Sequence, residues 1–348
     1  MKHKTYKLDP AIEKQLFATP TELDARVQEL LDNPSQIAPF MDFRVDWSFK
    51  YILGHEEAMI KLLNDILPVH VDTIEYLLNE IPVRSEKEKR AVFDVICTNK
   101  TTKEKFLCEM QRLPESDMDD RLLFYGCSLI QKQIKRKDKK YILNTVYVIC
   151  VADYERAHPT PVPADDFLFK YRLRDERWPE DVMTTKLQFY YLELPRFQKG
   201  WEAAQTNAER WCYLFRNLYK FAGVPRDASD FEPIFEIART EQFEEEQLKV
   251  YLNAMVTDYE KLVIGEYHEQ KGFKEGLEQG RAEGRAEGRA EGRAEGIAEG
   301  RAEGMEKGMK KGMEQGKMEV ARQMKKMGLS IAQIVQASGL PEEVVKGL

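Results

Sequence analysis

Acidic residues in two neighbouring apolar runs have the type and the spacing of a metal site. Asp94 lies in the middle of the run at residues 92–96, and Glu109 and Gln111 lie in the run at residues 106–111. Because successive side chains of a strand point to opposite faces, Glu109 and Gln111 are expected on one face, about 7 Å apart. The polar stretch TNKTTKEK separates the two runs. The pattern therefore predicts a hairpin that places Asp94 and Glu109 on paired strands.

Paired carboxylates in this setting favour divalent metal chemistry. Two half-buried carboxylates repel one another, and leaving them without a partner is costly. A cation such as Mg²⁺ (or Mn²⁺) removes that cost, because it binds through one or two carboxylates and keeps waters for a phosphate substrate. Such an ion would polarise a phosphate and activate a water, which is the chemistry of phosphodiester hydrolysis. The alternative is that Asp94 and Glu109 only pair with surface Lys or Arg side chains.

Gln111 has a more limited role in such a site. As a neutral amide it can orient a water or a phosphate, but it cannot act as a base. The way in which a water would be activated therefore stays open at the level of the sequence.

The surrounding elements predict a mixed α/β core. The run at residues 46–53 is followed by residues 58–67, which have helical spacing of apolar side chains, and Pro68 ends this pattern. Residues 121–134 predict a helix, and residues 141–151 predict a strand that is apolar enough to be buried on both faces. The order helix, strand, hairpin, helix, buried strand predicts a sheet flanked by helices.

The chain continues this pattern without a linker. Strands are predicted at residues 167–173 and 187–194, and helices around residues 211–215 and 243–263. We therefore expect one extended domain with an α+β C-terminal part.

Several short motifs resemble the Rpn branch, the recombination-promoting nucleases, of the PD-(D/E)XK nuclease family transposases. They are Asp46-x-x-Phe49-Lys50, Phe93-Asp94-Val95, Glu109-Met110-Gln111, Arg121-x-x-x-Tyr125 and Leu192-Glu193-Leu194-Pro195-x-Phe197. The resemblance covers about residues 41–262. It implies a restriction-endonuclease-like core and a metal-dependent endonuclease that cuts DNA with little base specificity, in recombination or a transposition-like activity.

The resemblance also implies roles for single residues. Asp94 and Glu109 would be the metal ligands, and Gln111 would stand where the wider superfamily has a Lys. Asp46 would be an accessory acid; alternatively, it is the N-cap of the helix that carries Phe49.

Arg121 and Tyr125 would contact or position the phosphate backbone. The alternatives are a salt bridge for Arg121 and core packing for Tyr125.

A basic run follows the helix predicted at residues 121–134. The formal net charge of the chain is −7, which is unfavourable for binding nucleic acid, but charge is unevenly distributed. The run KQIKRKDKK has six cations against one Asp138. Its predicted nucleic-acid contacts are Lys132, Lys135, Arg136, Lys137, Lys139 and Lys140. A solvated surface without a ligand is the alternative.

Glycine occupies every fourth position from Gly272 to Gly316, and the centre of this segment repeats RAEG. In a helix, residues four apart are neighbours, and here they are Arg with Arg and Glu with Glu, which is mildly destabilising. Each glycine also costs about 1 kcal/mol relative to Ala. The segment is therefore either a fluctuating spacer or a helix that packs along its glycine stripe against other chains. Because only small residues allow such close approach, we expect the second, a homo-oligomer.

A small helical module is predicted at residues 318–348. Ser330 and Gln333 have the spacing of a capping box, and a Gly-Leu-Pro step at residues 339–341 precedes a last short helix. Two short helices joined in this way resemble a truncated helix-turn-helix. The last helix carries only Lys346 as a cation, so a docking module is the alternative.

Composition limits where the protein is expected to act. There is no run of eighteen apolar residues, so no membrane span is expected. The N-terminus lacks an apolar signal core, and the five cysteines form no C-x-x-C pair. We therefore expect a cytoplasmic protein with reduced thiols.

The expected domains are residues 1–40, an N-terminal helical extension; 41–265, the nuclease-like domain; 266–317, the glycine repeat; and 318–348, the terminal module. Two other functions stay open. One is a weak or inactive nuclease fold that binds nucleic acid or oligomerises, and the other is a nuclease that acts on RNA. A metal site binds phosphate and does not read the 2′-hydroxyl, so the sequence does not separate DNA from RNA.

Overall fold

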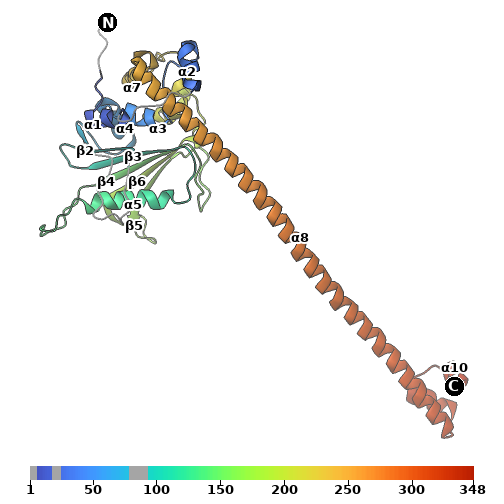
Figure 1. Cartoon of the computed structure of the whole chain (residues 1–348). Helices are drawn as coiled ribbons and strands as arrows, with labels where there is room; N and C mark the ends of the chain where they lie inside the picture. Colours follow the sequence, from blue (N-terminus) through green and yellow to red (C-terminus); the bar gives the residue numbers. More distant parts are fainter. Residues whose placement is uncertain (1–5, 18–24, 78–92) are drawn as a thin grey trace. The chain divides into compact units, whose positions relative to one another are not determined.

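The computed structural model describes residues 6–17, 25–77 and 93–348. It contains two compact units, Met1–Glu266 and Tyr267–Leu348, each of which is described here by itself. The first unit has a mixed sheet flanked by helices, which confirms the predicted α/β fold class (Figure 1).

The sheet has six strands in the order β1-β2-β3-β4-β6-β5. The strands are β1 (Ile74–Tyr76), β2 (Val95–Asn99), β3 (Lys105–Gln111), β4 (Val146–Ala152), β5 (Leu168–Arg174) and β6 (Val182–Glu193). β1, β2 and β3 pair antiparallel, and β5 pairs antiparallel with β6. β3, β4 and β6 pair parallel. The predicted hairpin is thus confirmed as β2 and β3.

Every residue of β4 is buried, as predicted, because it lies between two parallel strands with helices over both faces. The predicted strand start at Tyr141 is wrong. β4 begins at Val146, and the side chains of Tyr141 and Ile142 are exposed. The apolar run extends beyond the strand because parallel pairing with β3 begins only at Lys105 and Val146.

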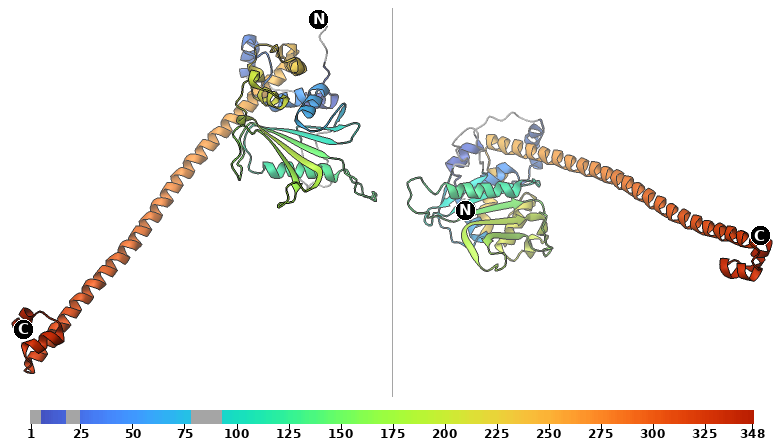
Figure 2. Two further views of the ribbon diagram at one scale, coloured as in Figure 1. Left: turned by 180° about the vertical axis from the view of Figure 1, so that it is seen from behind. Right: turned by 90° about the horizontal axis from the view of Figure 1, so that it is seen from below.

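Helices cover both faces of the sheet (Figures 1 and 2). α1 (Pro10–Leu16), α3 (Asp46–Leu53) and α4 (Glu56–Ile66) lie over one face, and α5 (Met118–Gln131) lies over the other. Side chains alternate between the two faces along β3, and each face has its own hydrophobic core. Phe106 and Cys108 pack on the side of α3 and α4, whereas Leu107 packs on the side of α5.

The remaining elements of the first unit extend the larger core. The helices are α2 (Ala25–Asp32), α6 (Asn207–Asn217) and α7 (Glu232–Ile237); the short 3₁₀ helices are Pro34–Gln36, Leu194–Arg196, Trp201–Ala203, Leu218–Lys220, Ser229–Phe231 and Thr240–Gln242. α6 begins with a capping box, and Trp211 on this helix is completely buried. α6 and α7 both pack against α4.

α8 (Glu245–Lys326) is an 82-residue helix that begins in the first unit and contains the whole glycine repeat. Its first turns are anchored, since Tyr251 and Leu252 are buried in the larger core. From Gly272 to Gly316, by contrast, a Cβ added at any repeat glycine would meet nothing within 4 Å. The repeat is therefore helical within one chain although no packing supports it there.

The two short helices predicted near the C-terminus are present, whereas residues 318–326 continue α8. α9 (Ile331–Ser338) starts with a capping box between Ser330 and Gln333, and α10 (Glu342–Gly347) follows. Gly339 ends α9 with a φ of +67°, a left-handed conformation that suits glycine. A small core joins the module to the end of α8; its buried residues are Ala321, Ile334, Leu340 and Val345.

No helix in the described part of the chain is long and apolar enough to cross a membrane.

Candidate active site

Asp94 and Glu109 lie side by side at the open end of the β2–β3 hairpin. The backbone N–H of Asp94 donates a hydrogen bond to the Glu109 carboxylate at 3.1 Å. In return, the backbone N–H of Met110 donates to the Asp94 carboxylate at 2.9 Å. These reciprocal bonds connect each acid to the backbone of the facing segment, so the predicted neighbourhood of the two carboxylates is observed.

The predicted position of Asp94 within a strand is wrong. β2 begins at Val95, which pairs with Cys108, and Asp94 immediately precedes it. Asp is unfavourable in a strand interior, and its carboxylate bonds a backbone N–H of the opposite segment. Val92, where the predicted strand began, lies outside the described residues.

Burial makes this pair electrostatically unusual. The Glu109 side chain is 3% exposed. Burial and then the charge of Asp94 raise the pKa of Glu109 well above its ordinary value. Burial also raises the pKa of Asp94, although the nearby Lys50 charge lowers it. Two adjacent carboxyls that resist ionisation are a favourable place for a cation, because a cation stabilises their charged forms.

Lys50 connects this pair to α3. Its ammonium group lies 2.7 Å from the Asp46 carboxylate, one helical turn earlier, and 3.3 Å from the Asp94 carboxylate. Burial lowers the pKa of Lys50, but the charges of Asp94 and Asp46 outweigh it and raise the pKa overall. Lys50 therefore stays protonated as a cation beside the acids.

Asp46 is not the N-cap of α3, and this alternative is wrong. The N-cap is Val45, and Asp46 is the first helical residue. Its carboxylate is half exposed and accepts from Lys50. The electrostatic field of Asp46 reaches Asp94, whose pKa it helps to raise. Asp46 thus lies next to the pair, as an accessory acid would.

Gln111 ends β3, two residues after Glu109, so the two side chains share the face of the sheet that α5 covers. The intervening Met110 packs on the other face. Gln111 is partly exposed, whereas Glu109 is buried. The amide is therefore accessible at the edge of the site.

Arg121 and Tyr125 face the acids from α5. The predicted helix start at Arg121 is wrong, since α5 begins at Met118 and places Arg121 within its first turns. Arg121 pairs with Glu115 at 2.6 Å, and its charge lowers the pKa of Glu109. The Nε of Arg121 is buried and has no hydrogen-bond partner among the described residues. Arg121 thus combines a salt bridge with an unused donor close to the acids.

Tyr125 is mostly buried and packs edge-on against Phe93, with ring centroids 4.9 Å apart. Burial and then the charge of Glu109 raise the pKa of its hydroxyl. Core packing is therefore its observed role, and a contact with phosphate stays a prediction.

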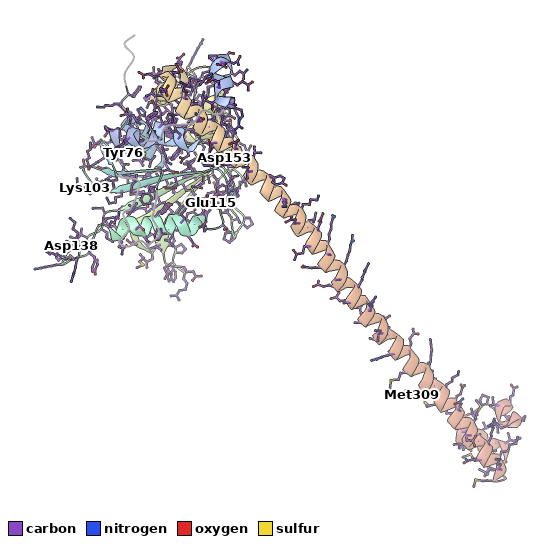
Figure 3. All side chains as sticks on the ribbon, in the orientation of Figure 1. Tyr76, Lys103, Glu115, Asp138, Asp153 and Met309 are labelled. Carbon is purple, nitrogen blue, oxygen red and sulfur yellow. The ribbon has the colours of Figure 1, made fainter. Side chains whose placement is uncertain are left out.

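The basic run lies away from the acids. α5 has fourteen residues, about 21 Å at 1.5 Å per residue. Glu115 precedes the N-terminal end of α5 and Asp138 lies beyond its C-terminal end (Figure 3). Burial and then the charge of the nearby Lys105 lower the pKa of Lys132. Lys105 begins β3, whereas Glu109 lies near the end of that strand. The structure therefore does not bring the run together with the acids, and its contact with nucleic acid stays a prediction.

The residues present fit a divalent cation bound through two carboxylates. Within residues 6–17, 25–77 and 93–348, no three His, Cys, Asp or Glu side chains are grouped as ligands. Mg²⁺ does not need a third protein carboxylate, because water and substrate phosphate complete its coordination. Asp94 and Glu109 supply the oxygens, and their raised pKa values indicate charge that no neighbour fully compensates.

Sequence reasoning named Lys50 in a motif but assigned it no role. The signal was present, because Asp46 and Lys50 have the i, i+4 spacing of a helical ion pair. The further contact of Lys50 with Asp94 depends on how α3 packs and has no signal in the local sequence.

A mixed sheet whose strand ends carry an Asp and a Glu–x–Gln, flanked by helices, is the architecture of the PD-(D/E)XK nucleases. The family model for the PD-(D/E)XK nuclease family transposases matches residues 43–264, more than half of the chain. The protein belongs to this family. No curated protein and no solved structure matches the chain.

Proposed function

We propose that the protein is a metal-dependent endonuclease that hydrolyses phosphodiester bonds of DNA with little base specificity. The observation that carries the proposal is the buried Asp94–Glu109 pair, joined by reciprocal hydrogen bonds at the end of a hairpin. A buried acid pair without a cation would be a lasting cost to stability, so a function that uses it is favoured.

Asp94 and Glu109 would hold Mg²⁺ (or Mn²⁺) between them. The bound ion would polarise the scissile phosphate and lower the pKa of a water. Hydrogen bonds from the backbone N–H groups of Met110 and Asp94 fix the two carboxylates in place. The chain thus prepares the ligands before substrate arrives, which reduces the reorganisation needed on binding.

Lys50 and Gln111 divide the role of the usual lysine between them. Lys50 supplies a fixed positive charge next to Asp94, which stabilises negative charge developing on a phosphate. Because its pKa is raised, Lys50 cannot accept a proton near neutral pH. Gln111 would orient the attacking water through its amide. Arg121 would bind a phosphate oxygen through the exposed part of its guanidinium group.

DNA binding would extend from the acids along α5 to the basic run. A low sequence preference follows if the contacts are to phosphate, since such contacts carry no base information. A link to recombination or a transposition-like activity is the expectation for a member of this family.

The glycine repeat would join two or more chains through close helix packing. Its glycines face open space in one chain, so their surface is available to a second helix. A dimer would present two active sites to one duplex. Light scattering on the full chain and on a shortened chain that ends at Tyr267 tests this, and monomers in both cases would contradict it.

The cleavage test uses supercoiled plasmid, linear duplex and RNA, each with and without Mg²⁺. We expect Mg²⁺-dependent nicking of the plasmid by the wild-type protein and none by Glu109→Gln. Mg²⁺ should also raise the Tm of the wild type but not of this variant, because a ligand stabilises the state that binds it. Glu75→Gln, which changes an exposed carboxylate on β1, is the matched control and should behave as wild type.

Cleavage of RNA alone would replace DNA by RNA as the substrate. Cleavage of neither, together with a Tm that does not respond to Mg²⁺, would support the inactive, nucleic-acid-binding alternative.

A further inference from the structure

A small cavity lies between α5 and the strands β5 and β6, on the face of the sheet that carries Glu109. Its volume is about 280 Å³. Leu122, Leu123 and Phe189 form apolar walls, and Leu123 is 49% exposed at the rim. Nothing in the proposed cleavage chemistry uses these residues. The cavity therefore needs a separate explanation.

The polar wall of the cavity is an ordered arrangement of one cation, one carboxylate and two aromatic rings. Arg156 donates to the Asp119 carboxylate at 2.6 Å and to the Tyr171 hydroxyl at 2.9 Å. Its guanidinium carbon lies 3.9 Å from the centre of the Tyr191 ring. Tyr191 also donates to Asp119. The guanidinium plane is thus fixed on three sides.

The loop that carries Arg156 is itself anchored. Glu193 is completely buried and accepts a hydrogen bond from the backbone N–H of Arg156 at 3.3 Å. The same carboxylate lies 3.0 Å from the imidazole of His158. Glu193 of the Leu192–Phe197 motif therefore has a structural role, which is to anchor this loop. The cleavage site does not explain why a Glu is present at this position. The anchor holds Arg156 in position before any ligand binds.

The cavity shares a face and a row of the sheet with Glu109. Glu109 is in register with Cys150 on β4, and Cys150 is in register with Tyr191 on β6. Two strand spacings of about 4.8 Å separate Glu109 from Tyr191, roughly 10 Å. On α5, Asp119 lies two residues before Arg121. The cavity is therefore adjacent to the place where a scissile phosphate would lie.

We propose that this cavity binds an unpaired nucleobase of the strand whose phosphate lies at Asp94 and Glu109; this inference rests on the proposed nuclease function. A base has two apolar faces and an edge of donors and acceptors. Apolar walls and an Arg plane suit the faces, since unpaired bases stack on aromatic rings and on guanidinium planes. The N–H groups of Arg156 that do not bond Asp119 or Tyr171, and the second lone pairs of the Asp119 oxygens, suit the edge.

The composition of the cavity favours a base over two other ligands. A free phosphate is disfavoured because Asp119 places a carboxylate in the wall and already pairs with Arg156. A volume of about 280 Å³ is at the small end for ligand sites, enough for one ring system but not for a helix or strand of a partner. The nuclease would then act preferentially where a strand is unpaired.

The test measures binding without cleavage. A fluorescein-labelled single-stranded DNA of twelve nucleotides is compared by anisotropy with the same strand carrying abasic sites, in EDTA and with the full chain. Both strands have the same phosphates, so a difference reports the bases. We expect the wild type to bind the strand with bases about ten-fold more tightly.

Substitutions at the rim of the cavity test whether the cavity causes this difference in affinity. Leu123→Ser and Tyr171→Ala should reduce the ten-fold preference to less than two-fold. Phe124→Ser is the matched control, because Phe124 is 45% exposed on the same helix but does not line the cavity. It should keep the full preference.

Equal affinity of the wild type for the two strands would overturn the proposal, and this comparison depends on no variant. A preference that survives Leu123→Ser and Tyr171→Ala alike would also overturn it. Failure of the nuclease proposal is distinguishable. Mg²⁺-dependent cleavage that Glu109→Gln leaves intact would remove the acids from catalysis while the base preference stands.

Discussion

The hairpin end of the first unit and the glycine repeat of α8 are both dense in charge, yet they use it in opposite ways. At the hairpin end, charged groups are mostly buried and each has partners from other elements. Asp94, for example, contacts Lys50 of α3 and the backbone of β3. In the repeat, charged side chains are exposed, and in its RAEG centre their neighbours one turn away have the same sign. Local, exposed pairs such as Glu303–Lys307 occur towards its C-terminal end.

A second network of buried charges in the first unit supports the same contrast with the repeat. Arg44 is paired with Asp42 at 2.9 Å and with Asp153 at 3.0 Å, and its side chain is 14% exposed. The Tyr259 hydroxyl from the start of α8 donates to Asp42. Inside the domain, contacts between distant segments therefore stabilise the charged groups. In the repeat, only the local period determines how the charged groups are arranged. A substitution should be costly in the first case and nearly neutral in the second.

The largest difference between the regions should follow from removing one carboxylate. Asp94→Asn keeps the shape of the side chain but removes a proposed metal ligand. If the ion supplies several kcal/mol of transition-state stabilisation, plasmid nicking should fall about a thousand-fold or more. Glu291→Gln, in the repeat, should leave the rate unchanged. Initial nicking rates in Mg²⁺ measure both. Equal rates in all three proteins would show that the buried pair is structural.

Arg→Ala substitutions in the two regions compare stability directly. Arg44→Ala leaves Asp42 buried without a cation and leaves Asp153 with Arg216 alone, and we expect a loss of about 3–5 kcal/mol in the free energy of unfolding. Arg289→Ala removes an exposed cation and should change it by less than about 0.5 kcal/mol. Urea unfolding followed by circular dichroism measures both values. Similar losses would contradict the contrast between buried and periodic charge.

Replacing cations by Ala tests whether the basic run of the first unit and the glycine repeat differ in their contribution to DNA binding. Replacing Lys135, Lys137 and Lys139 by Ala should reduce the log–log salt slope of DNA binding by about three, if each contacts a phosphate. Arg285, Arg289 and Arg293 replaced by Ala are a control with the same change in net charge and should leave the slope unchanged. A fall of equal size in both triple variants would mean that net charge alone controls binding.

Gly→Ala substitutions should change the stability least, with opposite signs on α5 and in the glycine repeat. Gly126→Ala on α5 places a Cβ 2.7 Å from a methyl of Leu187, which should cost about 1 kcal/mol or more through overpacking. Gly288→Ala meets nothing within 4 Å in its own chain, so in a dilute, monomeric sample it should increase helix stability by up to about 1 kcal/mol. Thermal unfolding of the two variants at low protein concentration measures the signs. At concentrations where the chains associate, the proposed close helix packing predicts that Gly288→Ala is destabilising instead, because the added methyl keeps the helices apart.

Local patterns were sufficient for most elements. Helical spacing identified α4, two apolar runs around a polar turn identified β2 and β3, and the Ser330–Gln333 spacing identified the cap of α9. Each of these signals depends on residues within one or two turns of each other. Boundaries were less certain, as at β4, because an apolar side chain next to a strand looks the same as one within it.

The sequence by itself predicted the acids of the candidate site, and it determined the period of the repeat and the family to which the chain belongs. Only the tertiary structure decided which residues from distant parts of the chain contact one another. Lys50 reaches Asp94 from another element, the basic run follows the far end of α5, and Arg156 stacks on Tyr191 thirty-five residues later in the chain. The physical reason is that a local sequence specifies dihedral angles and faces, whereas contacts between distant residues depend on strand order and on how helices pack over the sheet.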